Sequence, residues 1–252
     1  MRLVRFLAQG RAAHGVLRGD EVVELEGEGF SRPASRRAVH AAARVKLLAP
    51  CTPSKVVAVG LNYRDHAREL GMAVPGNPIL FLKPPTAVIG PGEAIVRPAM
   101  SSQVDYEAEL GLVIKDRCRG ISPEQARRHI LGYTCANDVT ARDLQKQDGQ
   151  WTRAKSFDTF CPVGPWIETD LDPGDLLVES YLNGEQRQSS RTSQFIFGVD
   201  RLVSFISQVM TLEPGDLVIT GTPAGIGPMQ AGDEIEVRIE GLGSLKNSVR
   251  DV

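Results

Sequence analysis

Three carboxylates in the sequence could together bind a divalent cation. Glu107 and Glu109 stand two residues apart in the run 104–114, whose composition is typical of a β-strand. Side chains two apart on a strand point to the same face, so these two carboxylates are expected to project together. Two carboxylates about 4 Å apart repel by roughly 4 kcal/mol at an effective dielectric of about 20. Protonation, a basic partner or a metal must therefore stabilise the pair.

Asp138 supplies the third carboxylate. It belongs to a second apolar stretch, residues 131–140, which could run alongside the first. A ligand set made only of oxygen favours magnesium, manganese or calcium over zinc. The alternative is an ordinary solvated face, because exposure is the default for charged side chains. Spacing alone leaves both interpretations open.

His66 and Glu69 could transfer protons. They lie in residues 62–71, which are predicted to form a short helix with Asn62 as its N-cap and Gly71 at its end. Side chains three apart on a helix share a face. A carboxylate beside a histidine orients the ring and favours its charged form, so the pair could activate a water molecule. It could also be a plain surface pair that contributes a few tenths of a kcal/mol.

Two lysines and a glycine-rich turn are further candidates. Lys83 follows an apolar strand and precedes two prolines, so it either extends to solvent or pairs with a buried carboxylate. Lys155 has no distinguishing context, and most lysines are solvated. The turn 220–227 offers hydroxyl and backbone N–H groups to an anionic oxygen but lacks the ending of a P-loop; a tight turn between strands is the alternative. Cys135 lies in a buried strand pattern and is a poor nucleophile candidate. We assign no role to His14, His40 or His129.

The elements that must position these residues are short and mostly strands. The expected strands are 2–8, 12–18 and 21–25, which form a meander, then 55–60, 79–82 and two within 216–240. The expected helices, besides 62–71, are 123–130 and 195–210. Residues 27–44 are interpreted as a connection that carries one short helix. The pattern predicts a β-rich α+β fold and not alternating βαβ units. Pro50 and Pro53 mark a boundary, which predicts a small N-terminal α/β domain over 1–49 and a large domain over 50–252.

Composition excludes several classes of protein. Charged residues make up 24% of the chain and the formal net charge is −2, so there is no basic footprint for nucleic acid. No apolar run approaches the roughly 20 residues that cross a bilayer, and the first residues lack a secretory pattern. The four cysteines are widely spaced without a Cys-x-x-Cys motif. We therefore expect a reduced, cytoplasmic protein.

Six segments resemble the fumarylacetoacetate hydrolase family in the family's order, over roughly residues 50–250. They are Gly60-Leu61-Asn62-Tyr63-Arg64-Asp65-His66, Phe81-Leu82-Lys83-Pro84, Tyr106-Glu107-Ala108-Glu109-Leu110, Asn137-Asp138-Val139-Thr140-Ala141-Arg142-Asp143, Trp151-Thr152-Arg153-Ala154-Lys155-Ser156-Phe157 and Ile219-Thr220-Gly221-Thr222-Pro223. Any one segment is weak evidence, and the ordered set is specific. The N-terminal part is similar to the leading domain of single-domain bacterial members and of acylpyruvase-like enzymes.

The resemblance implies a mixed β-sandwich roll, usually dimeric. It implies magnesium or manganese held by Glu107, Glu109 and Asp138, and His66 with Glu69 as a water-activating dyad on a lid that orders when substrate binds. It places Lys155 beside the metal and Thr222 near the substrate carboxylate. Arg142 and Gln145 match positions that face substrate in some members of the family.

The reaction stays open among three. We expect an enzyme acting on small 2-oxo or 2-hydroxy-dienoic acids from aromatic or amino-acid breakdown, since a divalent cation and a lysine would stabilise an enolate. The first choice is carbon–carbon bond hydrolysis of an acylpyruvate such as fumarylpyruvate. The alternatives are isomerisation of 2-hydroxyhepta-2,4-diene-1,7-dioate and decarboxylation of oxaloacetate or 5-oxopent-3-ene-1,2,5-tricarboxylate. A non-catalytic metal-binding scaffold is the alternative from another class.

Overall fold

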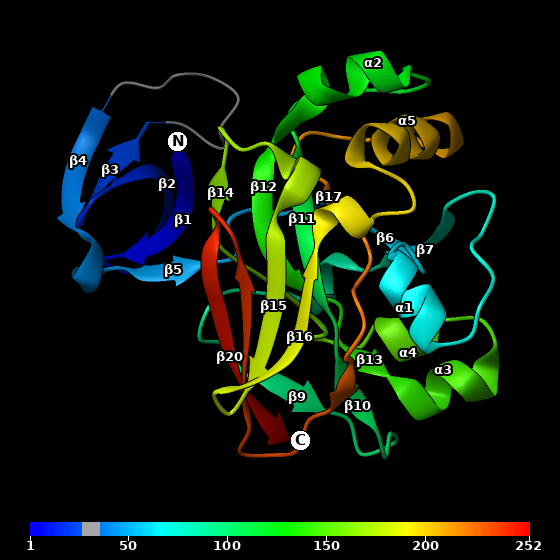
Figure 1. Cartoon of the computed structure of the whole chain (residues 1–252). Helices are drawn as coiled ribbons and strands as arrows, with labels where there is room; N and C mark the ends of the chain where they lie inside the picture. The colour runs from blue at the N-terminus through cyan, green and yellow to red at the C-terminus, as the bar shows by residue number, and fades with distance from the viewer. Residues whose placement is uncertain (27–35) are drawn as a thin grey trace.

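Strands make up most of the regular structure in the computed structural model, which describes residues 1–26 and 36–252. Two large sheets pack against each other, and short helices lie around their edges (Figure 1). Most neighbouring strands are antiparallel, as in β11 with β12 over residues 108–114 and 130–137. The prediction of a β-rich α+β fold is therefore confirmed.

The first sheet extends across the whole molecule. In spatial order its strands are β4 (Arg36–Ala41), β3 (Glu21–Leu25), β2 (Arg11–Arg18), β1 (Arg2–Ala8), β14 (Cys161–Glu168), β12 (Ile130–Asn137), β11 (Ala108–Ile114), β17 (Leu217–Ile219), β6 (Val56–Gly60) and β7 (Ile79–Lys83). Two short strands join it from the side, β5 (Lys46–Leu48) on β1 and β8 (Val88–Ile89) on β14. The strands β11, β6 and β7 carry site residues at or near their ends.

The second sheet covers one face of β11, β12 and β14. Its strands in order are β16 (Glu185–Arg191), β15 (Leu177–Leu182), β19 (Glu234–Ile239), β20 (Gly243–Asp251) and β9 (Ile95–Arg97). Alternate side chains of the facing strands interdigitate, since Leu110 and Leu112 from β11 lie in one buried cluster with Val178 and Val237. A third, small sheet consists of β13 (Thr140–Ala141), β10 (Val104–Tyr106) and β18 (Gly227–Pro228).

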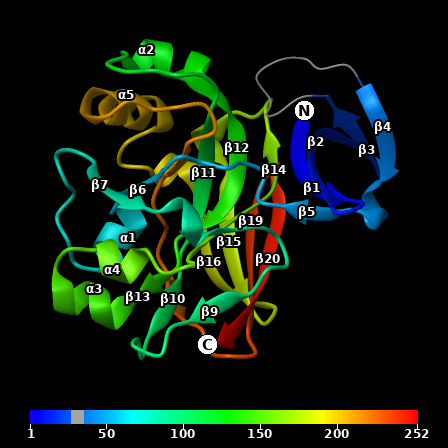
Figure 2. The same ribbon diagram turned by 180° about the vertical axis from the view of Figure 1, so that it is seen from behind.

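The helices lie in two groups (Figures 1 and 2). At one end of the sheets are α2 (Pro123–Ala126) and α5 (Val199–Val209), which pack on each other. Near β7 lie α1 (Arg64–Glu69), α3 (Arg142–Asp148) and α4 (Thr152–Lys155). The 3-10 turns are Ala42–Arg44, Pro85–Ala87, Arg127–His129, Pro173–Asp175 and Thr192–Gln194. Within the described residues, no helix combines the length and hydropathy that crossing a membrane requires.

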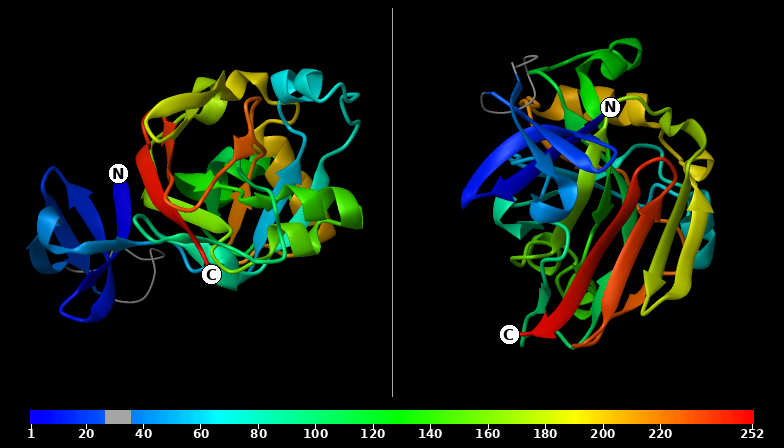
Figure 3. Two further views of the ribbon diagram at one scale, coloured as in Figure 1. Left: turned by 90° about the horizontal axis from the view of Figure 1, so that it is seen from below. Right: turned by 90° about the vertical axis from the view of Figure 1, so that its left-hand side faces the viewer.

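The N-terminal strands β1 to β5 form a small curled unit at one side of the larger body (Figure 3). The predicted meander over β1, β2 and β3 is confirmed by antiparallel pairing. The interpretation of 27–44 as a connection is wrong for residues 36–41, which form β4 and pair with β3. Residues 27–35 lie outside the described residues. The described part of 1–49 contains strands and one 3-10 turn and no α-helix, unlike the predicted α/β domain.

Four other element predictions need correction. The predicted strand 104–114 is broken at Glu107, whose backbone N–H binds the side chain of Asn137 at 2.9 Å and leaves the strand ladder. The helix predicted over 123–130 ends at Ala126, where the chain passes into the 3-10 turn Arg127–His129 before β12. The longest helix starts at Val199 and not at residue 195, and β18 adds a short strand within 216–240.

Candidate metal centre and active site

The three predicted carboxylates meet where β11 begins and β12 ends. Glu107 precedes β11, Glu109 lies within it, and Asp138 follows β12 directly. One ligand oxygen from each lies within 4.8 Å of the others, and all three side chains are buried. Although the strand breaks at Glu107, this residue stays beside Asp138, because the backbone N–H of Asp138 binds the carbonyl of Glu107 at 2.9 Å. The sequence prediction that these groups converge is therefore right in geometry.

Three cations accompany the cluster, two buried lysines and a partly buried arginine. Lys155 Nζ donates to Glu107 Oε2 at 2.9 Å and to Asp138 Oδ2 at 2.6 Å. Lys83 Nζ contacts Asp138 Oδ1, so the buried alternative for this lysine is the one found. Arg142 Nη2 contacts Glu107 Oε1. The Lys155 and Arg142 charges outweigh burial, which alone would raise the pKa, and they lower the pKa of Glu107 below its usual range.

Glu109 has a different environment. Its Oε2 accepts the backbone N–H of Gly221 at 2.7 Å, and no cationic side chain in the described part of the chain pairs with it. Burial, and then the charges of Asp138 and Glu107, raise the pKa of Glu109 well above its usual value. Glu109 is thus the carboxylate of the cluster that has no cationic side-chain partner among the described residues.

A divalent cation fits this charge balance. Glu107, Glu109, Asp138 and the adjacent Asp105 give four negative charges, and Lys83, Lys155 and Arg142 give three positive ones, which leaves a formal −1. A doubly charged ion would change this to +1, which suits a bound anion. The donors are all oxygen, as magnesium and manganese prefer. Glu107, Glu109 and Asp138 are the residues that could hold such an ion.

His66 and Glu69 form the predicted pair on α1. His66 Nδ1 lies 2.8 Å from Glu69 Oε2, and the imidazole is buried. Its Nε2 has no hydrogen-bond partner among the residues described, which leaves that atom for a ligand or water. The predicted N-cap is wrong: Asn62 does not cap the helix, because its Nδ2 binds the carbonyls of Thr220 at 2.7 Å and Phe197 at 3.1 Å. Asn62 thereby fixes α1 to the glycine-rich turn.

That turn holds protein carboxylates with its backbone. Gly221 N–H binds Glu109, and Gly225 N–H binds Glu69 Oε1 at 3.0 Å. The prediction that the turn presents N–H groups to an anionic oxygen is therefore met by the protein's own side chains. Gly225 has φ +98°, and a Cβ there would lie 2.3 Å from the Arg187 carbonyl, so a glycine is required.

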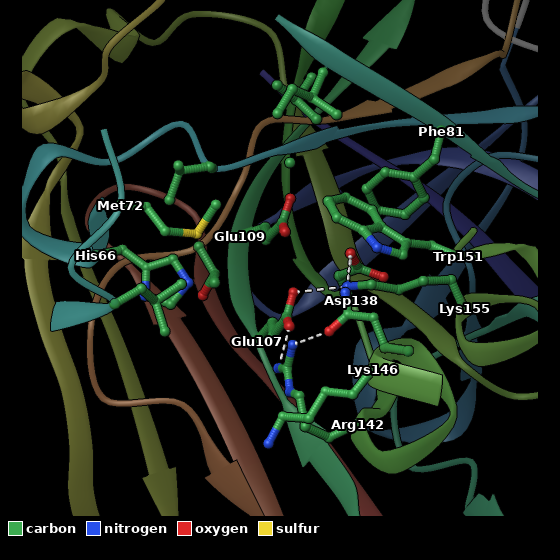
Figure 4. A pocket seen from close by; sticks show the side chains of 17 residues that line it. His66, Met72, Phe81, Glu107, Glu109, Asp138, Arg142, Lys146, Trp151 and Lys155 are labelled. Carbon is green, nitrogen blue, oxygen red and sulfur yellow. Dashed lines mark hydrogen bonds and ion pairs between the residues drawn. The ribbon is translucent and has the colours of Figure 1, made fainter. Parts of the chain in front are cut away.

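A cavity of about 280 Å³ joins the carboxylate cluster to the dyad. Figure 4 shows Glu107, Glu109 and Asp138 at its centre, with His66 on one side and Trp151 on the other. The remaining lining residues are Val59, Gly60, Leu61, Leu70, Met72, Ile79, Phe81, Arg142, Gln145, Lys146, Lys155 and Thr222. The wall is mostly apolar and the floor is charged, an arrangement typical of small-molecule sites.

The three residues predicted to bind substrate all line this cavity, but their polar groups already have protein partners. Arg142 Nε donates to Asp105 at 2.9 Å, and its Nη1 donates to Gln145 Oε1 at 2.6 Å. The Thr222 hydroxyl donates to the carbonyl of Ala108 at 2.9 Å. In this structure these side chains support the site, and contact with substrate stays a prediction.

Sequence reasoning missed the aromatic wall. Phe81 and Trp151 make an edge-to-face contact with centroids 5.3 Å apart, and Lys155 Nζ lies 5.1 Å from the Phe81 ring centroid. A Cβ at Gly60 would lie 2.6 Å from the Trp151 ring, so this glycine makes room for the indole. Both aromatic residues lie inside matched segments, yet only the tertiary structure places them beside Lys155.

Comparison with known proteins gives a consistent result. The family model described as fumarylacetoacetate (FAA) hydrolase C-terminal matches residues 55–250, and the model described as Rv2993c-like, N-terminal matches residues 1–50. The crystal structure of a 5-carboxymethyl-2-hydroxymuconate delta-isomerase from Mycobacterium smegmatis has a TM-score of 0.95 and 45% identity, with 100% of each chain covered. The mitochondrial oxaloacetate tautomerase FAHD2A of Bos taurus is 41% identical over 98% of this chain and 79% of its own length.

A third relative was solved with ligands. The maleylpyruvate hydrolase from Sphingobium sp. SYK-6, in complex with manganese(II) and pyruvate, has a TM-score of 0.84 and 31% identity over 100% of this chain and 99% of its own. These relatives include an isomerase, a tautomerase and a hydrolase, so the family is one of enzymes with several reactions. The match over residues 55–250, with the fold and the carboxylate cluster, shows that this chain belongs to the fumarylacetoacetate hydrolase family.

Proposed function

We propose that the protein is a magnesium- or manganese-dependent enzyme that hydrolyses a carbon–carbon bond in a small acylpyruvate. The observation that carries the proposal is the cavity that places the carboxylate cluster opposite the His66–Glu69 dyad. A 2-oxo carboxylate is the kind of anion that a site with a formal +1 charge would accept. The manganese and pyruvate in the related maleylpyruvate hydrolase support this substrate class.

The cation, held by Glu107, Glu109 and Asp138, would supply Lewis-acid stabilisation to the enolate that forms when the bond breaks. Lys155 contributes a fixed positive charge beside that position. Burial would lower the pKa of Lys155, but the charges of Asp138 and Glu107 outweigh it and raise the pKa, so the amine stays protonated. Its ammonium is already positioned by two carboxylates and needs little reorganisation during the reaction.

The dyad would move one proton through the reaction. Glu69 orients the imidazole through Nδ1, and Nε2 accepts a proton from water. The water oxygen adds to the distal carbonyl carbon, the bond between that carbon and C3 of the pyruvate unit breaks, and its electron pair forms the enolate. The imidazolium then returns its proton to C3. The products are a carboxylic acid and pyruvate, and the overall reaction consumes one water molecule.

Isomerisation or keto–enol tautomerisation is the second candidate. The isomerase and tautomerase relatives share 45% and 41% of residues with this chain, against 31% for the hydrolase. In this alternative His66 carries a proton between two positions of the substrate, and no water adds. With the cation bound, the same site would stabilise the enolate. Decarboxylation, a homodimer and a cytoplasmic location stay predictions.

The cavity also suggests a second negative charge on the substrate. Of the cations that line it, Lys155 and Arg142 pair with carboxylates, whereas Lys146 has no ion pair within the described part of the chain. Lys146 is exposed on α3, so it could bind a carboxylate at the far end of the substrate. This favours a dicarboxylate such as fumarylpyruvate over acetylpyruvate.

The test is a substrate panel. Fumarylpyruvate, acetylpyruvate and oxaloacetate are each incubated with protein from which metal has been removed by a chelator. The same incubations are repeated with added Mg²⁺ or Mn²⁺. We expect metal-dependent release of pyruvate from fumarylpyruvate. Metal-dependent change of the oxaloacetate enol signal without new products would favour the tautomerase. No turnover and no metal-dependent shift in Tm would favour the non-catalytic scaffold.

A further inference from the structure

Gln188 joins the two halves of the site from a distant strand. It belongs to β16, a polar strand in which the preceding residues 185–187 are exposed and the Gln188 side chain is fully buried. Its amide reaches across to β11 and to the glycine-rich turn, where it makes three hydrogen bonds with described residues. A buried glutamine on a polar strand is unusual enough to need a reason.

The three bonds clamp two specific backbone segments. Gln188 Oε1 accepts the N–H of Ala108 at 3.0 Å, and Ala108 lies between Glu107 and Glu109. Gln188 Nε2 donates to the hydroxyl of Thr222 at 2.8 Å and to the carbonyl of Pro223 at 2.9 Å. The side chain therefore links the backbone between Glu107 and Glu109 to the turn residues that follow Gly221.

The turn connects this clamp to the His66–Glu69 dyad. Thr222 and Pro223 lie between Gly221, whose N–H binds Glu109, and Gly225, whose N–H binds Glu69. The Thr222 hydroxyl closes the clamp, because it accepts from Gln188 and donates to the carbonyl of Ala108. One amide side chain thus holds the carboxylate cluster and the dyad at a fixed separation.

Only glutamine has the required groups here. The position needs one acceptor for the Ala108 N–H and two donors for Thr222 and Pro223, at the end of a side chain of this length. A glutamate would place a carboxylate oxygen against the Pro223 carbonyl, and an apolar residue would leave buried backbone groups unsatisfied.

We infer that Gln188 is a positioning residue that sets the geometry between the carboxylate cluster and the His66–Glu69 dyad. The inference rests on the proposed function for its consequence in metal binding and turnover. The clamp itself is testable in the metal-free protein. Residues that orient metal ligands from behind typically change metal affinity by roughly 10- to 100-fold when they are replaced.

The experiment compares Gln188→Glu and Gln188→Met with Asn247→Asp. Asn247 is a matched control, since it is a buried amide on β20 that clamps the carbonyls of Gly90 at 2.9 Å and Glu93 at 2.8 Å. The first readout is hydrogen exchange of the Gly221 and Gly225 amides in metal-free protein, referred to amides of β14. The second is titration of metal-free protein with Mn²⁺ alone.

We expect faster exchange at Gly221 and Gly225 and at least about tenfold weaker Mn²⁺ binding in folded Gln188 variants, with neither change in Asn247→Asp. The methionine variant keeps the side-chain length, so it serves if the glutamate variant does not fold. Wild-type exchange at both glycines in a folded Gln188 variant would overturn the inference. If the wild-type protein itself does not bind Mn²⁺, the proposed function fails. The exchange measurement still tests whether Gln188 holds the glycine-rich turn in place.

Discussion

Lys83 and Asp138 form an ion pair beneath the cavity, in which the side chains are 0% and 1% exposed. Removing one partner of a buried ion pair strongly destabilises a fold when the other charge is left without compensation. Asp138 would keep Lys155 as a partner after Lys83 is removed, so the loss is expected at the lower end of the range for buried pairs.

Replacing Lys83 by Met should therefore destabilise the fold. We expect the free energy of unfolding to fall by about 3 kcal/mol, measured by urea denaturation of the metal-free protein. Lys46→Met is the control, because Lys46 is half exposed and pairs with Glu93 at 3.4 Å, a surface contact that contributes about 1 kcal/mol or less. Equal losses in the two variants would contradict the importance of the buried pair.

Replacing Glu109 by Gln should abolish metal binding without changing the stability of the metal-free protein. The raised pKa of Glu109 favours its neutral form in the metal-free protein, so an amide that still accepts the Gly221 N–H should change little there. We expect unchanged urea stability without metal, together with loss of Mn²⁺ binding and of turnover. Full activity of the variant in added Mg²⁺ would count against the cluster as the metal site.

Metal binding should release a proton. Because the pKa of Glu109 is raised, the group binds a proton below that pKa, whereas a cation requires the ionised form. Apparent Mn²⁺ affinity should then rise about tenfold per pH unit until the pH passes this pKa. Calorimetry in two buffers of different ionisation enthalpy measures the released protons, and a buffer-independent heat would contradict the prediction.

The dyad should be needed for turnover and not for metal binding. His66→Ala removes the group that accepts the proton, so kcat should fall by roughly 100-fold or more while the Mn²⁺ Kd stays the same. Glu69→Gln keeps an acceptor for the Gly225 N–H but loses the charge beside His66, and it should lower kcat less. Normal hydrolysis by His66→Ala would show that another group activates water.

Lys146 should discriminate between substrates. Lys146→Met is expected to raise KM for fumarylpyruvate about tenfold, which corresponds to the ~1.4 kcal/mol of one charged hydrogen bond. KM for acetylpyruvate, which lacks the second carboxylate, should not change. Parallel effects on both substrates would remove Lys146 from substrate recognition.

Short-range spacing predicted that Glu107 and Glu109 share a face and that His66 meets Glu69, whereas the place of Asp138 beside the two glutamates and the roles of these residues came from the family resemblance. Glu107 and Glu109 stay on one face, and His66 meets Glu69 within one helical turn. The break at Glu107 was not predictable from the alternation, because it arises from the side chain of Asn137, 30 residues away.

Long-range contacts account for the rest. The sequence left Lys83 open between solvent and a buried partner, and only the approach of β7 to the end of β12 decides it. Asn62 has the composition of an N-cap but binds Thr220 and Phe197, since tertiary partners outcompete the local one. Gln188 gave no signal at all, because its partners come from two other parts of the chain.

The most direct measurement is anomalous diffraction from crystals of the protein soaked in Mn²⁺. The account predicts one strong peak at coordination distance from oxygens of Glu107, Glu109 and Asp138, within the cavity that His66 lines. Its loss in Glu109→Gln crystals would support the assignment further. Crystals that hold Mn²⁺ elsewhere, or not at all, while the enzyme in solution turns over with Mn²⁺, would contradict it.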